Sequence, residues 1–283
     1  MMKAGRFVVD SHVHAQRFAA GKAMRERLRQ ERGESVEEGQ KPQEAGQESG
    51  GSRWVALSEV MYDLEPYDNS ARLLYDMECY GVDMCVLLPG FGMSNELNLQ
   101  LVERYPDKFV AVCNPRDYLL RVARGEESWS IEGVCAELDR LLSTGKFVGI
   151  GEGMPYLPYP PDPYDPVSRR EAITNMLAIM EVARRHKVPV MYHTGSGMGY
   201  KTTYSVAPLG PANLNPLWAH DLASAFPDVP IILNHGGIQG WWSEKLWEDC
   251  LHVAAAHDNV YLETGLWWTE LYERALVDPN IGP

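Results

Sequence analysis

The sequence predicts an α/β fold of the TIM-type (β/α)8 barrel class, because short apolar segments alternate with amphipathic helical segments along the chain. Several apolar segments are nearly continuous and rich in β-branched residues, as expected for parallel strands covered on both faces. No G-x-G-x-x-G turn follows the first segment, which disfavours an open dinucleotide-binding sheet. The length of 283 residues suits one barrel, so a single domain over residues 1–283 is expected.

Seven strands are predicted from apolar runs that end in polar or glycine residues, over residues 6–10, 82–90, 108–115, 147–153, 188–195, 229–237 and 259–265. The intervening segments carry apolar residues at helical spacing. Helices are therefore predicted over residues 69–81, 95–108, 131–146, 168–187, 215–228 and 243–258. The seventh strand is followed by a further helical segment and a turn. The predicted barrel thus lacks its eighth strand in this chain.

Two segments interrupt the alternation of strands and helices. Residues 21–53 begin as a charged stretch and become rich in Gly, Glu and Gln, which predicts a mobile insertion after the first strand. Such an insertion suits a lid that orders on binding or a plain surface loop. Residues 155–166 (PYLPYPPDPYDP) form a Pro- and Tyr-rich loop after the fourth strand. Both segments would lie on the catalytic face of a barrel.

The net charge of −13 disfavours nucleic acid and anionic membranes as partners, because both require a basic surface. No apolar run approaches the roughly 18 residues of a membrane span, and the N-terminus lacks a signal-peptide core. The five cysteines are scattered without a C-x-x-C pair, which predicts reduced, mostly buried thiols. We therefore expect a cytoplasmic protein that acts on a small molecule, including an anionic one, either alone or as a homo-oligomer.

The most specific motif is Asp10-Ser-His12-Val-His14, at the end of the first predicted strand. Side chains at i and i+2 of a strand point to the same face, so both imidazoles can reach one metal ion. His193 ends the fifth predicted strand (VMYHTG) and His235 ends the sixth (ILNHGG). Catalytic groups of such barrels come from the carboxyl ends of several strands. The sequence therefore predicts a metal centre at this rim.

Together, D-S-H-V-H, Y-H-T-G and N-H-G-G resemble the amidohydrolase superfamily, in order and over residues 6 to about 266. They are most similar to the amidohydrolase-related group that includes aminocarboxymuconate semialdehyde decarboxylase. The resemblance implies that His12, His14 and His193 bind one divalent metal together with an Asp after the eighth strand, and that His235 acts as acid and base beside it. That Asp has no counterpart, since Asp278 lies in a predicted turn (DPNIG).

Two glutamates end predicted strands. Glu152 ends the fourth strand, where members of the superfamily with two metals carry a bridging group. It could bridge to a second metal held by His193 and His235, bind substrate, or be a structural rim residue. For Glu263, at the end of the seventh strand, a structural role is favoured.

Candidate substrate-binding residues are cationic or aromatic. Arg17 and Arg53 flank the insertion, and Arg116 follows the third strand. Arginine suits bidentate binding of a carboxylate, although most arginines are simply solvated. Trp241, after the sixth strand, can form a pocket wall or pack against loops.

We expect a metal-dependent carboxy-lyase that decarboxylates an aromatic or unsaturated carboxylic acid without oxidation. One alternative is a hydrolase of an amide, lactone or ester at the same centre, and another is an inactive truncated barrel. Zinc suits a His-rich site, and Mn, Fe or Co is also compatible.

Overall fold

The structure, a computed structural model, describes residues 5–15, 69–90, 93–123, 125–153, 166–195, 215–238, 244–265 and 267–281. The predicted insertion over residues 21–53 and nearly all of the loop over 155–166 lie outside the described residues.

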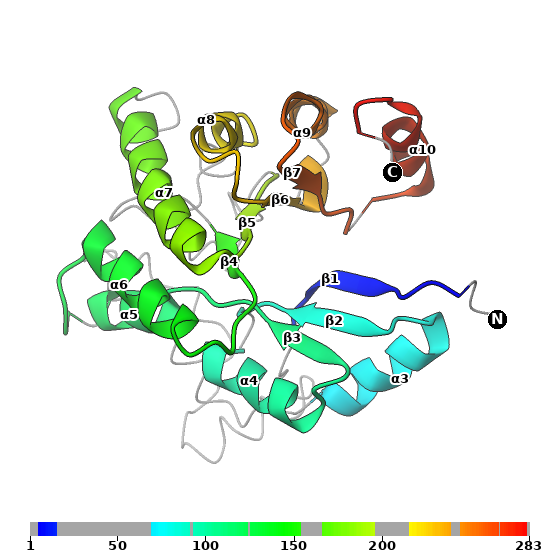
Figure 1. Cartoon of the computed structure of the whole chain (residues 1–283), viewed down its shortest axis with the longest axis horizontal. Coiled ribbons are helices and arrows are strands. Elements are labelled where there is room, and N and C mark those ends of the chain that lie inside the picture. The colour runs from blue at the N-terminus through cyan, green and yellow to red at the C-terminus, as the bar shows by residue number, and fades with distance from the viewer. Residues whose placement is uncertain are drawn as a thin grey trace, which may run out of the picture.

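Seven parallel strands form the centre of the molecule (Figure 1). One sheet holds β1 (Val9–Val13), β2 (Met84–Leu87) and β3 (Phe109–Ala111), and the other holds β4 (Ile150–Gly153), β5 (Val190–His193), β6 (Ile231–Asn234) and β7 (Val260–Leu262). Every pairing is parallel, and within each sheet each strand pairs with its neighbours in sequence. This is the strand order of a TIM-type barrel, and it confirms the predicted fold class.

The two sheets are joined by a short parallel bridge between Cys113 and Ile150. The amide of Cys113 donates to the carbonyl of Gly149 at 3.0 Å, and the amide of Gly151 donates to the carbonyl of Cys113 at 2.8 Å. The bridge continues the order from β3 to β4, so the described strands run in one series from β1 to β7.

Helices lie outside the strands, as Figure 1 shows. They are α3 (Ser70–Tyr80), α4 (Asn95–Arg104), α5 (Arg116–Ala123), α6 (Ile131–Leu142), α7 (Pro166–His186), α8 (Trp218–Ala225), α9 (Glu244–Ala256) and α10 (Thr269–Val277). Local sequence sets several ends: the hydroxyls of Ser94 and Ser130 accept from the third residue beyond them, and Gly81 ends α3 in the left-handed conformation. Helix α5 was not predicted.

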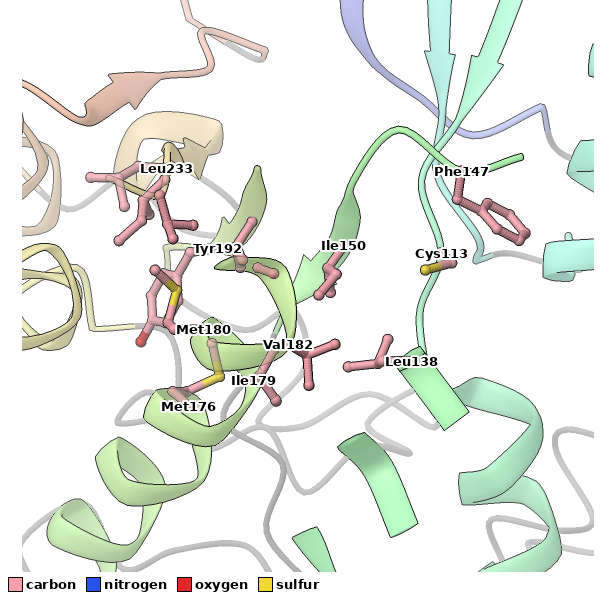
Figure 2. Packing of buried hydrophobic residues seen from close by; sticks show 14 of the residues in the cluster. Cys113, Leu138, Phe147, Ile150, Met176, Ile179, Met180, Val182, Tyr192 and Leu233 are labelled. Carbon is pink, nitrogen blue, oxygen red and sulfur yellow. The ribbon is translucent and has the colours of Figure 1, made fainter. Parts of the chain in front are cut away.

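The core lies between the strands and α7, whose inner face carries Met176, Ile179 and Met180 (Figure 2). These side chains are at most 1% exposed and pack in one cluster with Tyr192 of β5 and Leu233 of β6. Burying a large apolar side chain contributes roughly 1.5–3 kcal/mol. Helix α7, predicted from residues 168–187, therefore packs against the strands that end in His193 and Asn234 and helps to fix their position.

The cysteines of the described residues are all free thiols, as predicted. Cys85, Cys113 and Cys250 are buried, and burial raises the pKa of each to about 12. Cys79 is exposed and Cys135 is partly exposed. The three buried thiols are therefore protonated and unreactive at neutral pH.

The first strand lies further along the chain than predicted, over Val9–Val13 instead of residues 6–10. Phe7 and Val8 are consequently exposed, and His12 lies inside the strand. After β7 the chain forms α10, and within the described residues no strand follows β7. None of the described helices combines the length and hydrophobicity needed to span a bilayer.

Candidate metal centre

Four histidines meet at the carboxyl ends of three strands. His12 lies in β1 and His14 directly follows it, His193 is the last residue of β5, and His235 directly follows β6. The ring centroids are 5.1 Å apart for His12 and His14, 4.6 Å for His12 and His235, and 4.7 Å for His193 and His235. The structure thus brings together all four histidines of the sequence motifs. Which of them bind a metal stays a prediction.

The first two histidines point their Nε2 atoms toward each other, at a separation of 3.3 Å. Nδ1 of His14 lies 3.2 Å from the carbonyl oxygen of Leu88, which can only accept, so this nitrogen carries the ring proton. The ring also packs closely against Gly90, where a Cβ atom would lie 3.1 Å from Nδ1 of His14. His14 therefore presents the lone pair of Nε2 to the cluster.

Glu263, directly after β7, lies against two of the histidines. Its Oε2 atom is 3.2 Å from Nδ1 of His12 and 3.8 Å from Nδ1 of His235. The same oxygen accepts a hydrogen bond of 2.7 Å from the backbone amide of His235, and Oε1 accepts one from the amide of Gly265. The sequence favours a structural role for Glu263, and the structure places its carboxylate against two of the four histidines.

The carboxyl group of Glu263 is ionised. Burial acts to raise its pKa, but the hydrogen bonds from His12 and from the amides of His235 and Gly265 outweigh burial and hold the pKa below its ordinary value. Nδ1 of His12 lies 3.2 Å from this carboxylate, which would stabilise a ring proton on Nδ1. In that tautomer the lone pair of Nε2 of His12 faces Nε2 of His14, 3.3 Å away.

His235 occupies a strained turn. Its φ is +62°, a left-handed conformation that is uncommon for residues other than glycine. Gly236 and Gly237 follow, also at positive φ, and a Cβ atom at Gly237 would lie 2.6 Å from the backbone carbonyl of Leu246. Indole Nε1 of Trp267 donates to the carbonyl of His235 at 3.0 Å. Backbone strain of this kind is concentrated at functional sites.

The side chain of Thr194 also stabilises this turn. Its hydroxyl, fully buried, donates to the carbonyl of Asn234 at 2.5 Å and accepts from the amide of Gly237 at 2.8 Å. The thiol of Cys250 also donates to this hydroxyl, at 3.6 Å. One side chain after β5 therefore determines the path of the chain on both sides of His235.

The donor set fits a divalent metal ion. Two nitrogen ligands on one tetrahedral ion, each about 2.0–2.1 Å away, are about 3.3 Å apart, which is the separation of the Nε2 atoms of His12 and His14. Without a cation or a shared proton, two facing lone pairs at this distance repel each other. In addition, ligand atoms of His12, His235 and Glu263 all lie within 4.8 Å of one another. These residues can hold a metal ion, on either side of the His12 ring.

The remaining predicted site residues are less informative. Glu152 lies in β4 as predicted, but its side chain is outside the described residues, as are Arg17, Arg53 and Trp241. Arg116 begins α5, and its amide donates to the side chain of Asn114 at 3.2 Å. A role of these residues in binding substrate stays a prediction.

The chain matches the model of the amidohydrolase family (Amidohydro_2) over residues 9–280 and belongs to this family. It is thus an enzyme of the amidohydrolase class, with a histidine- and glutamate-containing group suited to a metal. The more specific resemblance to aminocarboxymuconate semialdehyde decarboxylase stays a prediction. No curated protein matches the chain.

Two solved structures are similar at low identity. One is a probable 2-pyrone-4,6-dicarboxylic acid hydrolase from Acinetobacter baumannii with citric acid bound, at 11% identity and a TM-score of 0.39, covering 91% of this chain and 69% of that chain. The other is a uronate isomerase from Bacillus halodurans, at 13% identity and a TM-score of 0.41, covering 77% of this chain and 54% of that chain.

Proposed function

We propose that the protein is a metal-dependent decarboxylase that removes CO2 from an aromatic or unsaturated carboxylic acid without oxidation. The observation that carries the proposal is the pair of Nε2 atoms of His12 and His14, 3.3 Å apart, beside the buried ring of His235. A bound divalent ion would supply a positive charge that holds the substrate's oxygen atoms and stabilises the charge formed as the C–C bond breaks.

His12 and His14 would hold the ion through Nε2, and His193 at the end of β5 would complete the set of histidine ligands. The proposed role of His235 is to move the proton. When the C–C bond to the carboxyl group breaks, CO2 leaves and the electron pair of that bond stays on the substrate carbon. A proton from the imidazole of His235 then binds this carbon in place of the carboxyl group. The left-handed turn and the hydrogen bonds to Glu263 and Trp267 support this role, because they hold the His235 backbone in place.

A single metal would favour decarboxylation over hydrolysis, since two-metal sites suit the attack of water on a carbonyl. The substrate is proposed to be anionic, and Arg116 at the start of α5 is a candidate to bind its carboxylate.

The proposal is tested first by metal content and then by product. One equivalent of Zn, Mn, Fe or Co in the purified protein, lost in the double variant His12→Ala/His14→Ala, is the expected result. Purified enzyme should then release CO2 from hydroxybenzoates or unsaturated diacids and should not open lactones. Two metal equivalents with lactone opening would replace the decarboxylase by a hydrolase, and no metal in the wild type would exclude both.

A further inference from the structure

We infer that Glu263 is a positioning residue outside the metal coordination sphere, and that it fixes both the ring of His12 and the backbone of His235. The inference rests on the proposed function, because the orientation of His12 matters only if Nε2 binds an ion. In this arrangement His12, His235 and Glu263 form a polar network, and the ion would bind on the side of the His12 ring that faces His14, away from Glu263.

The first argument comes from the lone pairs of the carboxylate. Oε2 accepts a hydrogen bond of 2.7 Å from the backbone amide of His235 and lies 3.2 Å from Nδ1 of His12, so two nitrogen atoms already occupy the space around this oxygen. Oε1 accepts from the amide of Gly265. A carboxylate oxygen accepts about two hydrogen bonds, and a cation at Oε2 would be repelled by the hydrogen atoms directed at it.

The second argument is the proton on His12. An imidazole binds a metal through an unprotonated nitrogen, and a carboxylate oxygen 3.2 Å from Nδ1 of His12 favours the ring proton on that nitrogen. The ring therefore offers Nε2 to the ion, on the side where Nε2 of His14 lies 3.3 Å away. Metal-binding histidines generally donate their second N–H to a carboxylate or a carbonyl, which fixes the orientation of the ring.

The two rings are held by acceptors of different charge. Nδ1 of His14 faces the neutral carbonyl of Leu88 at 3.2 Å, and Nδ1 of His12 faces the charged carboxylate of Glu263 at a similar distance. A charged acceptor makes the opposite nitrogen a stronger donor to a metal. We therefore expect the metal affinity to depend more on Glu263 than a single hydrogen bond would suggest.

The second task of Glu263 concerns His235. The carboxylate binds the amide of His235, and Trp267, four residues further along the chain, binds its carbonyl. The segment after β7 thus holds both peptide groups of a residue at a φ of +62°. In this way one side chain sets the distance between the metal-binding ring of His12 and the acid–base ring of His235.

The test compares Glu263→Gln, Glu263→Asp and the control Glu270→Gln, which removes a charge from an exposed position of α10. Two properties are measured: the affinity for Zn²⁺ by chelator competition, and the visible absorption of the Co²⁺-loaded protein, which reports the ligand atoms. We expect Glu263→Gln to bind one Co²⁺ with unchanged band positions, and to lose about 10–100-fold in Zn²⁺ affinity. Glu270→Gln should match the wild type.

If the Co²⁺ bands shift or weaken in Glu263→Gln while the wild type still binds one equivalent, Glu263 is a metal ligand. That result would overturn the inference and leave the proposed function standing. Unchanged Zn²⁺ affinity in Glu263→Gln would also overturn it. A wild type that binds no Co²⁺ would overturn the proposed function together with the inference. Glu263→Asp keeps the carboxylate on a shorter side chain and serves as the test if Glu263→Gln does not fold. It should show unchanged Co²⁺ bands and a reduced affinity for Zn²⁺.

Discussion

Buried His193 and His235 at the strand ends and the more exposed pair formed by His220 and His257 have the same ring spacing but different surroundings. The centroids of His193 and His235 are 4.7 Å apart, and so are those of His220 and His257. In the exposed pair, the two rings bind each other through Nε2 and Nδ1 at 2.7 Å, so one nitrogen donates and the other accepts.

The strand-end cluster uses other groups as acceptors. Nδ1 of His12 lies beside the carboxylate of Glu263 and Nδ1 of His14 beside the carbonyl of Leu88, and the two Nε2 atoms face each other. Proximity of histidines is therefore insufficient for a metal centre. The acceptors behind the rings favour the tautomers that direct both Nε2 atoms to one place.

The largest difference between the strand-end histidines and the exposed pair should appear in metal binding. His12→Ala/His14→Ala should lose the bound ion, with an affinity more than about 100-fold lower, because two ligands are removed at once. The matched variant His220→Ala/His257→Ala removes a pair of equal composition and should keep the full metal content. Elemental analysis of both proteins decides the comparison, which would be wrong if the exposed pair also held an equivalent.

The turn that carries His235 can be broken without touching a histidine. Gly237→Ala places a Cβ atom 2.6 Å from the carbonyl of Leu246 at a φ of +83°, and should cost more than about 3 kcal/mol of unfolding free energy. The control is Gly145→Ala, at a φ of +69° with no atom within 4 Å of the new Cβ. It carries the backbone cost alone, about 1 kcal/mol. Urea unfolding measures both, and equal losses would exclude the contact with Leu246 as the cause.

The hydroxyl of Thr194 offers a smaller perturbation of the same turn. Thr194→Val keeps the shape but leaves the buried amide of Gly237 without its acceptor, which should cost about 2 kcal/mol and weaken metal binding. Thr194→Ser keeps the hydroxyl and should cost about 1 kcal/mol for the lost methyl group. Thermal unfolding with and without Zn²⁺ compares them. A larger loss in the serine variant would show that packing, and not the hydrogen bonds, holds the turn.

The exposed pair should contribute only a weak pH dependence. Burial and the neighbouring His220 lower the pKa of His257 below 6.5, so the unfolded chain takes up this proton at a higher pH than the folded protein does. The stability from this group is therefore complete above pH 6.5 and is lost as the pH falls through the lowered pKa. His257→Ala should reduce the change in unfolding free energy between pH 5 and pH 7 by about 0.5 kcal/mol or less, as for surface substitutions generally.

The sequence predicted the strands and the histidines well because both depend on local patterns. Each predicted strand has an observed counterpart, and the motifs around His12, His193 and His235 place these residues at strand ends. The shift of the first strand to Val9–Val13 was not predictable from apolar content, since pairing of Val9 with Met84 and of Asp10 with Cys85 sets its register.

The role of Glu263 was missed for a similar reason. Its position at the end of the seventh strand was evident, and the same rule that selected His193 and His235 applies to it. Its partners were not evident, because His12 lies at the other end of the chain and the contact exists only in the folded protein. Helix α5 was missed although Tyr118, Leu119 and Val122 lie at helical spacing, because it has only 8 residues and directly follows the third predicted strand.

The contact between His12 and Glu263 has a consequence for biosynthesis. Chains emerge from the ribosome with the N-terminus first, so the H-x-H pair appears early and its carboxylate partner appears among the last residues of the described fold. Until then the carboxylate beside His12 is missing, and the turn of His235 lacks its hydrogen bonds to Glu263 and Trp267. Tight capture of the ion therefore has to wait until the chain has been synthesised through the segment after β7.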